Sequence, residues 1–295
     1  MQNNAADDAN AAEQSRRVEV NEADTYADMF DGVSRDIADR LGLSSQRIGS
    51  AVVLSAAGFQ KSLIVNRVIG LGAGESFTPD MLDQIERLYA AVQTNTYALE
   101  ISPASEPPEL MATLKARGFF RFKQTAMLHR RVEVIAPPAC ALRIRRAAPE
   151  QAAEFVDICV KVFGLDEPIR SLLATTFAGR AWQHWLAFDG DMPVGAALTH
   201  LAGDVAWFGW VGTLSSHRGR GAQSALTAAQ LEGATESGCR WVTLETATGT
   251  AEQPHPSMRN YCRLGWTVAH QRGVFVRRGR RSEPVFPGTP VEQGN

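Results

Sequence analysis

The chain has 295 residues, a formal net charge of −2, a hydrophobic share of 44% and a charged share of 21%. This length predicts one large or two medium domains, and the composition is typical of a globular protein with a substantial core. The nearly balanced charge argues against a protein that binds nucleic acid or a membrane surface as a whole, and no apolar run approaches the roughly 18 residues of a membrane-spanning helix.

The N-terminal segment, residues 1–20, is polar and slightly acidic and has no signal-peptide pattern, which predicts a disordered leader. A Pro-Pro pair at 137–138 interrupts the regular patterning and marks a boundary. We therefore expect one domain at 21–135, a second at 141–278, and a flexible tail at 279–295.

The cysteines have no spacing that is typical of a metal site or a CxxC motif. They are Cys140, Cys159, Cys239 and Cys262. We therefore expect reduced thiols, a cytoplasmic protein and no bound metal.

The second half alternates regularly between predicted helices and strands. Apolar residues at Ala152, Phe155, Val156 and Cys159 have the spacing of an amphipathic helix, with proline near its first turn. In chain order, the expected elements are a strand at 142–146, helices at 149–163 and 168–177, strands at 181–188, 194–201 and 205–213, a helix at 222–237, a strand at 241–246, a helix at 257–264, and a strand or hairpin at 266–277. This order predicts an α/β fold with a mixed sheet.

The first half contains weaker versions of two second-half segments. Residues 97–102 (YALEIS) resemble residues 241–246 (WVTLET), and residues 114–119 (LKARGF) resemble residues 261–266 (YCRLGW). A nearly constant shift along the chain relates both pairs, so we expect a duplicated fold. The alternative is a chance match of two short segments.

A glycine-rich turn at 218–223 carries the strongest functional signal. Arg218 and Arg220 supply positive charge, Gly219 and Gly221 leave the backbone uncovered, and a helix is expected to begin near Ala222. The first N–H groups of such a helix are unpaired and attract anions. The pattern predicts a phosphate-binding turn at the end of a central strand. The alternative is a turn with two solvated arginines and no ligand.

The second half resembles the GCN5-related N-acetyltransferase (GNAT) superfamily. That family marks its acetyl-CoA pyrophosphate site with Arg/Gln-x-x-Gly-x-Gly/Ala at such a turn, and residues 218–223 match it, except that Gln223 replaces the final small residue. The resemblance covers about residues 142–277, and the first half only as a degenerate copy, whose loop at 71–79 has glycines but no arginine. It implies a duplicated GNAT-like acyl-CoA N-acyltransferase fold with acetyl-CoA as co-substrate.

The resemblance also implies a set of cofactor-binding residues. The strand segment 211–213 would pair its backbone with the pantetheine arm, and Gly212 would permit a close approach or a bulge. Asn260 would hydrogen-bond the pantetheine arm or cap a short helix. The full expected set is Val211, Gly212, Thr213, Arg218, Gly219, Arg220, Gly221, Ala222, Gln223 and Asn260.

Two residues are candidates for proton transfer. Tyr261 matches the tyrosine that often protonates the departing CoA thiolate in the family, and the alternative is a core aromatic. Glu245 resembles a strand glutamate that deprotonates the amine, for which burial would raise its pKa; the alternatives are a solvated glutamate or an ion pair with an arginine. His200, His217 and His255 are rival bases that we expect to be solvated.

Two further groups of residues have less specific patterns. Trp182 and Trp185 on one strand, and Trp207 and Trp210 on the next, are spaced so that each pair is expected to face opposite sides of the sheet. One of each pair would fill the core, and the other could line an acceptor groove and favour an apolar or aromatic acceptor. The basic run, which we expect to be a solvated strand edge and tail, is Arg272, Arg277, Arg278, Arg280 and Arg281.

The sequence therefore predicts an acetyltransferase that moves the acetyl group of acetyl-CoA to an amine by direct attack in a ternary complex. The alternatives are a CoA-binding or regulatory protein without chemistry and an acyltransferase for longer acyl-CoA. We expect a small-molecule acceptor rather than a protein, no nucleic acid or membrane partner, and a monomer or homodimer.

Overall fold

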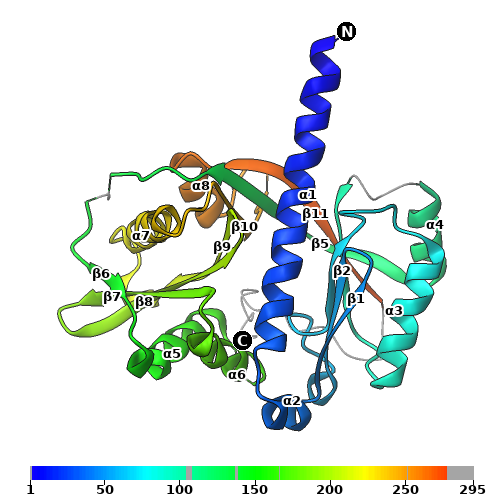
Figure 1. Ribbon diagram of the computed structural model, residues 1–295, viewed down its shortest axis with the longest axis horizontal. Helices are drawn as coiled ribbons and strands as arrows, with labels where there is room; N and C mark the ends of the chain where they lie inside the picture. The colour runs from blue at the N-terminus through cyan, green and yellow to red at the C-terminus, as the bar shows by residue number, and fades with distance from the viewer. Residues whose placement is uncertain (1, 104–107, 137–138, 166, 251, 278–295) are drawn as a thin grey trace.

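The computed structural model describes residues 2–103, 108–136, 139–165, 167–250 and 252–277. Its described strands form one mixed sheet in the order β1-β2-β3-β4-β11-β5-β10-β9-β8-β7-β6 (Figure 1). The strands are β1 (Leu43–Ile48), β2 (Ala51–Ala56), β3 (Arg67–Leu71), β4 (Ala98–Ile101), β5 (Phe119–Arg131), β6 (Arg143–Arg146), β7 (Trp182–Asp189), β8 (Met192–Ala202), β9 (Val205–Thr213), β10 (Trp241–Ala247) and β11 (Thr267–Arg277). This mixed α/β architecture confirms the predicted fold class.

Helices cover both faces of this sheet. The α-helices are α1 (Gln2–Asp31), α2 (Arg35–Leu41), α3 (Pro79–Ala91), α4 (Pro108–Ala116), α5 (Ala152–Phe163), α6 (Ile169–Thr175), α7 (Ala222–Glu236) and α8 (Pro256–Arg263), and the short 3₁₀ helices are η1 (Ala57–Phe59), η3 (Pro149–Gln151), η4 (Thr176–Ala178) and η5 (Ser215–His217). Apolar residues of α1, α5 and α6 share one core cluster, whereas α3, α7 and α8 pack into other clusters. Among the described helices, none combines the length and apolar character that crossing a membrane requires.

The two halves repeat the same order of elements. The first half runs α1-α2-β1-β2-β3-α3-β4-α4-β5, and the second runs α5-α6-β7-β8-β9-α7-β10-α8-β11 after the additional strand β6. The helices α4 and α8 both lead into a glycine with a positive φ, 84° at Gly118 and 82° at Gly265. The repeated order agrees with the predicted duplication and with the segments on which it depended.

Each half contributes its last strand to the middle of the sheet. Strand β11 lies between β4 and β5, and β5 lies between β11 and β10, with every pairing antiparallel. Neither half therefore completes its hydrogen-bond ladder with its own strands alone. The boundaries at 21–135 and 141–278 remain predictions. The exchange itself could not be predicted from the sequence because such pairings join residues far apart along the chain.

The N-terminal segment differs from the disordered leader expected over residues 1–20. Residues 2–31 form helix α1, which lies across the centre of the sheet (Figure 1). Its polar contacts with the sheet include a hydrogen bond that Thr243 donates to Asn21 and the 2.7 Å approach of Glu19 to His270. Its buried apolar side chains, which pack into the core, lie mostly after residue 20. The composition of residues 1–20 predicted disorder because this segment contains few large apolar residues and no apolar stripe.

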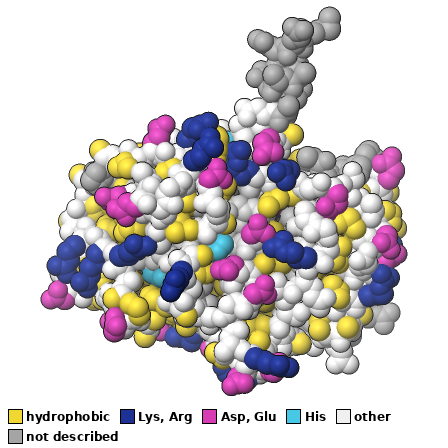
Figure 2. Space-filling model, viewed as in Figure 1, with side chains coloured by type: hydrophobic (Ala, Val, Ile, Leu, Met, Phe, Trp, Pro, Cys, Tyr) yellow, Lys and Arg dark blue, Asp and Glu magenta, His cyan; other side chains and the backbone are white. Residues whose placement is uncertain are grey.

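The basic run at the C-terminus also differs from its prediction where it is described. Arg272 is fully buried beneath α1 rather than solvated, because carboxylates of Glu19 and Glu22 contact its guanidinium at 3.2 and 2.7 Å. Arg277 is half-exposed and pairs with Glu86. Arg278, Arg280, Arg281 and the tail at 279–295 lie outside the described residues. On the face that Figure 2 shows, positive and negative side chains are interspersed, in keeping with the net charge of −2.

Helix α7 lies close against the sheet because its facing residues are small. A Cβ on Gly233 would come within 2.4 Å of Gln183 Oε1 and 2.7 Å of the Trp185 ring. Ala222, Ala225, Leu226 and Leu231 are buried on the same helix. This close packing fixes the start of α7 relative to the end of β9, where the candidate site lies.

Candidate active site

The glycine-rich turn connects β9 to α7 through η5. Gly219 and Gly221 have φ angles of 77° and 79°, which favour glycine. Gly221 is the N-cap of α7 and has no side chain to cap it, and the first turn of α7 has no acidic residue. No side chain therefore caps the positive end of this helix, as an anion-binding turn requires, although Cys140 lies against the turn and donates to the Arg220 carbonyl at 3.2 Å.

The two arginines of this turn have different surroundings. Arg218 is exposed, and its Nε donates to the Thr213 carbonyl at 3.3 Å. Arg220 makes two hydrogen bonds to Asp189, at 2.6 and 3.2 Å, which also lower the pKa of Asp189. Arg220 therefore ties the turn to the end of β7, while Arg218 keeps its charge at the surface.

Strand β9 has a bulge beside this turn. Its register against β8 runs from Gly209 opposite Leu198 to Gly212 opposite Ala196, so β9 contains one extra residue, and Trp210 has a φ of 53°. The bulge lies just before Gly212, at which the sequence allowed either a close approach or a bulge. A Cβ on Gly212 would lie 2.5 Å from Val162, so this glycine allows α5 to pack against the strand.

Beyond the bulge, β9 has an edge that β10 does not cover. The β9–β10 pairing is parallel and ends at Trp207 opposite Thr243. The two strands then diverge, and residues 208–213 of β9 are not paired with β10. Unpaired backbone groups at such an edge are available to an extended ligand.

The bulge also changes which way the tryptophans face. Trp207 and Trp210 both join the core cluster of α1 and α5 and both line the same cavity, so the prediction that they face opposite sides is wrong. Because the bulge inserts one extra residue, side chains three positions apart on β9 point to the same face of the sheet. Trp182 and Trp185 do lie in different clusters, as predicted.

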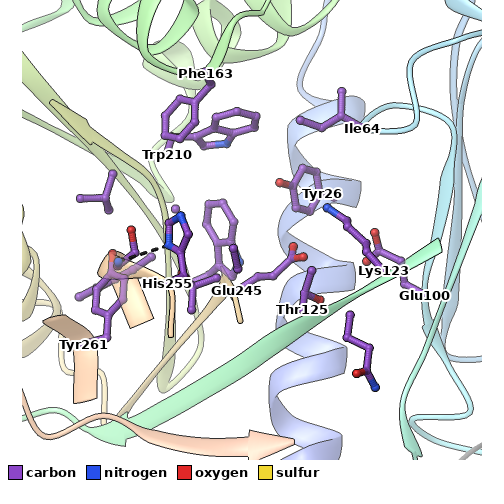
Figure 3. A pocket seen from close by; sticks show the side chains of 18 of the residues that line it. Tyr26, Ile64, Glu100, Lys123, Thr125, Phe163, Trp210, Glu245, His255 and Tyr261 are labelled. Atoms are coloured by element: carbon purple, nitrogen blue, oxygen red, sulfur yellow. Dashed lines mark hydrogen bonds between the residues drawn. The ribbon is translucent and has the colours of Figure 1, made fainter. Parts of the chain in front are cut away.

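A cavity of about 540 Å³ extends from this edge into the junction of the two halves (Figure 3). One wall is aromatic, with Phe163 and Trp210 at one end and Tyr26 against Trp207 in an edge-to-face contact at 5.7 Å. The remaining lining residues that matter to the chemistry are Arg67, Glu100, Lys123, Thr125, Gln223, Glu245, His255 and Tyr261. Residues of both halves therefore enclose one cavity.

Glu245 is brought to this cavity by β10, with its side chain 21% exposed. Burial alone would raise its pKa, but the guanidiniums of Arg272 and Arg67 and the ammonium of Lys123 lower the pKa to about 2 overall. The guanidinium contacts are 3.3 Å to Arg272 and 3.8 Å to Arg67. The expected rise in the pKa of Glu245 is therefore wrong, and of the alternatives left open by the sequence the structure shows the ion pair.

Tyr261 is brought to the opposite end of the cavity by α8 and is 5% exposed. Burial raises its pKa to about 12, although hydrogen bonds with the side chains of Gln223 and Thr227 lower it in part. Its hydroxyl therefore remains protonated at neutral pH.

Gln223 links α7 to α8. Its Oε1 accepts a hydrogen bond from Asn260 Nδ2 at 2.7 Å, in addition to its contact with Tyr261. Asn260 lies inside α8, whose N-cap is His255, so Asn260 does not cap that helix. The departure from a small residue at position 223 thus has a structural reason: the amide joins the turn to the tyrosine.

The three histidines have different environments. His200 is buried beneath α1, where it contacts Thr25 and Asp28, so the expectation that it is solvated is wrong. His217 contacts Asp189 at 3.3 Å. His255 is exposed and lines the cavity, but its Nδ1 accepts the Ser257 amide N–H, so a neutral ring carries its proton on Nε2 and has no free lone pair.

Comparison with solved structures identifies the arrangement. A GCN5-related N-acetyltransferase from Kribbella flavida superposes with a TM-score of 0.58 at 20% identity, covering 83% of this chain and 95% of that one. A tandem GNAT protein from the clavulanic acid biosynthesis pathway has a TM-score of 0.56 at 17% identity, covering 94% and 98%. The fold is that of the GNAT proteins. A third GNAT structure, from Sphaerobacter thermophilus, has a TM-score of 0.55 at 16% identity, covering 79% and 82%.

The structural comparison shows the GNAT fold that the motifs of the second half predicted, whereas two comparisons of the sequence found no match. No protein-family model matches the sequence. A comparison with curated proteins also found no match. The coverage of the tandem GNAT protein extends over nearly the whole of both chains, so the likeness includes both halves and not the second half alone.

Several residues of this GNAT-fold cavity were missed by the sequence analysis. Tyr26, Arg67 and Glu100 come from the first half, and Glu22 contacts the same charged groups from α1. The similarity of residues 97–102 to 241–246 was the signal that could have identified Glu100, because it aligns with Glu245. The others have no motif, since they reach the site only through the packing of the two halves.

Proposed function

We propose that the chain transfers the acetyl group of acetyl-CoA to the amine of a small acceptor by direct attack within a ternary complex. The observation that carries this proposal is the single cavity, which extends from the uncovered edge of β9 to Glu245 and has Tyr261 at one end. A donor site and an acceptor site that share one cavity allow the amine to reach the thioester without a covalent enzyme intermediate.

The diphosphate of acetyl-CoA would bind at the turn before α7. The backbone N–H groups of Gly219, Gly221 and Ala222 supply donors, and the exposed Arg218 supplies charge. Arg220 would act mainly by holding the turn to Asp189. The free edge of residues 211–213 would pair with the pantetheine arm, with Gln223 and Asn260 beside it.

The acceptor would occupy the part of the cavity that both halves enclose. An aromatic wall that includes Tyr26, Trp207 and Trp210 favours an acceptor with an apolar or aromatic body. The carboxylate of Glu245 together with these rings favours an ammonium group at its end. The enclosure by first-half residues favours a small molecule over a protein, and the first half would contribute this pocket rather than a second cofactor site.

The reaction requires three proton movements. A proton leaves the ammonium for the Glu245 carboxylate, and the neutral nitrogen then forms a bond to the thioester carbon. As the carbon–sulfur bond breaks, Tyr261 donates its proton to the departing CoA sulfur, and the second proton lost by the nitrogen returns to the tyrosine oxygen. The buried phenol retains this proton at neutral pH, which suits a donor.

Two substitutions test this proposal with a panel of aromatic and aliphatic amines. We expect Tyr261→Phe and Glu245→Gln each to lower kcat by about a hundredfold or more while acetyl-CoA still binds in calorimetry. Turnover that neither substitution affects would contradict the assigned roles. Binding of acetyl-CoA without turnover of any amine would favour a regulatory CoA-binding protein. Tighter binding of longer acyl-CoA would favour a different acyl donor.

A further inference from the structure

Three glutamates from different elements meet beneath helix α1. Glu22 of α1, Glu100 of β4 and Glu245 of β10 each place a carboxylate oxygen within 4.8 Å of the others. Glu22 is fully buried, and among the described residues no hydrogen-bond donor reaches its Oε1. The other oxygen of Glu22, Oε2, accepts a hydrogen bond from Arg272 at 2.7 Å, so the carboxylates of Glu22 and Glu245 lie close together with one buried oxygen still unpartnered in the described part of the chain.

Two carboxyl groups this close can form a hydrogen bond with each other only if one of them carries a proton, because ionised carboxylates only accept. Like charges at this separation also disfavour ionisation of both groups, particularly where water is excluded. Two guanidiniums offset part of this cost. Arg272 lies 2.7 Å from both Glu22 and Glu100, and Arg67 lies 2.9 Å from Glu100.

Glu22 is the member of the pair that is better placed to hold the proton. Burial has the largest effect on its pKa and, together with Glu245 and Glu100, raises it to about 8 against the lowering effect of Arg272 and Arg67. Glu245 is more exposed and closer to the cavity. The charged and titratable groups around Glu22 are Glu19 and Tyr26 on α1, His270 and Arg272 on β11, Arg67 on β3, Glu100 on β4 and Glu245 on β10.

We propose that Glu22 and Glu245 share a single proton between helix α1 and strand β10, and that Glu22 thereby controls how strong a base Glu245 is. Glu22 does not line the cavity, so it is a positioning residue that acts through Glu245. The N-terminal helix then belongs to the acceptor site, although it precedes the second half by more than a hundred residues in the sequence.

The consequence for catalysis depends on the proposed acetyl transfer. While Glu22 keeps its proton, Glu245 is held as a carboxylate of low basicity and takes a proton from an ammonium group poorly. When Glu22 ionises, the pair can accept one proton from the acceptor amine, and that proton resides between the two carboxylates. Transfer should therefore increase as the pH rises to about 8 and then level off.

The first test does not require any catalysis. The protein is labelled with ¹³C at the glutamate side-chain carboxyl carbons, and their resonances are followed by NMR from about pH 5 to about pH 10. We expect one glutamate to titrate near pH 8 in the wild type and in Glu19→Gln, and this titration to be absent in Glu22→Gln. Glu19 is the matched control because it contacts Arg272 and His270 one turn earlier on α1.

The second test is the pH profile of kcat for the same variants. Glu22→Gln keeps a donor beside Glu245 at every pH, so it should equal the wild type at acidic pH and be about a hundredfold slower at alkaline pH. Glu19→Gln should retain the wild-type profile. A Glu22→Gln variant with an unchanged NMR titration or an unchanged alkaline limb would overturn the inference. A normal NMR titration without turnover of any amine would overturn only the proposed function.

Discussion

Two turns occupy corresponding places in the two halves and differ in every feature that an anion requires. The turn before α7 has Gly221 as its N-cap, no acidic residue in the first helical turn, and an exposed Arg218. The turn before α3 has Thr78 as an N-cap that accepts from the Met81 amide, a proline without an N–H at the first position, and Asp80 in the first turn. The same strand–turn–helix geometry is therefore open to a phosphate in one half and already satisfied in the other.

The first-half turn also contains a carboxylate, that of Glu75, which is already hydrogen-bonded. The Glu75 carboxylate accepts hydrogen bonds from the Ser50 backbone N–H at 2.9 Å and from its hydroxyl at 3.0 Å. A Cβ on Gly49 would lie only 2.2 Å from Glu75 Oε1, so the carboxylate occupies the space beside the loop. The two halves thus share an order of elements, and small local differences separate the proposed binding turn from its first-half counterpart.

The largest difference between the halves concerns the proton donor. In the aligned segments the residue four positions before the glycine is Tyr261 in the second half and Leu114 in the first, and leucine has no proton to donate. We expect Tyr261→Phe to reduce kcat by about a hundredfold to ten-thousandfold while Kd for acetyl-CoA changes little. Steady-state kinetics with calorimetry would measure both. A variant with near-normal kcat would show that the two halves do not differ in this way.

The next largest effect concerns the two turns themselves. Arg218→Ala should weaken acetyl-CoA binding by about tenfold to a hundredfold, because one charge-assisted contact to the diphosphate is lost. The matched change in the first half, Glu75→Ala, should leave the affinity unchanged. Calorimetry would measure the Kd for acetyl-CoA of both variants. Equal weakening by both changes would mean that the first-half turn also takes part in binding.

A smaller effect is expected from Gln223, which joins the second-half turn to helix α8. Gln223→Ala removes the bonds to Asn260 and Tyr261 and should lower kcat a few-fold, with little change in Kd, because the tyrosine is held less firmly. Gln84 on α3 serves as a control, since its amide contacts only its own helix at Asp80 among the contacts described. A loss of affinity larger than the loss of kcat would assign Gln223 to the cofactor instead.

The smallest effect concerns the tie between Arg220 and Asp189, which has no counterpart described at the first-half turn. The folded-state pKa of Asp189 is lowered, so the stability from this pair is present above the ordinary carboxyl value of 3.8 and is lost as the pH falls through the lower folded value. Asp189→Asn should lower the melting temperature by about one or two degrees at neutral pH, and not at acidic pH. A difference that persists in acid would mean that the pair does not cause it.

Features formed by residues close together along the chain could be predicted from the sequence. Residues 205–237 encode a strand, a turn and a helix in succession, so the glycines and arginines between them could be placed without knowledge of the fold. Trp210 could not be placed, because a bulge breaks the alternation on which its orientation was predicted. The partners of Glu245 could not be predicted either, because Arg272 lies on the exchanged strand β11 and Arg67 lies on β3 of the other half.

Helix α1 shows the same limit in another form. Disorder was predicted for residues 1–20 because they are mostly polar, and the helix is held partly by apolar side chains that join the core and partly by the polar residues Glu19, Asn21 and Glu22. Each of these polar residues has a partner on the central strands, and these partners lie more than two hundred residues away. A polar interface between distant segments cannot be recognised until both sides are placed.

The most direct test of this account is a crystal structure of the full chain with acetyl-CoA. The account predicts one cofactor per chain, with its diphosphate at residues 218–223, its pantetheine arm along the free edge of β9, and its sulfur within hydrogen-bond reach of the Tyr261 hydroxyl. A diphosphate at residues 72–78, a second cofactor in the first half, or a sulfur remote from Tyr261 would contradict it.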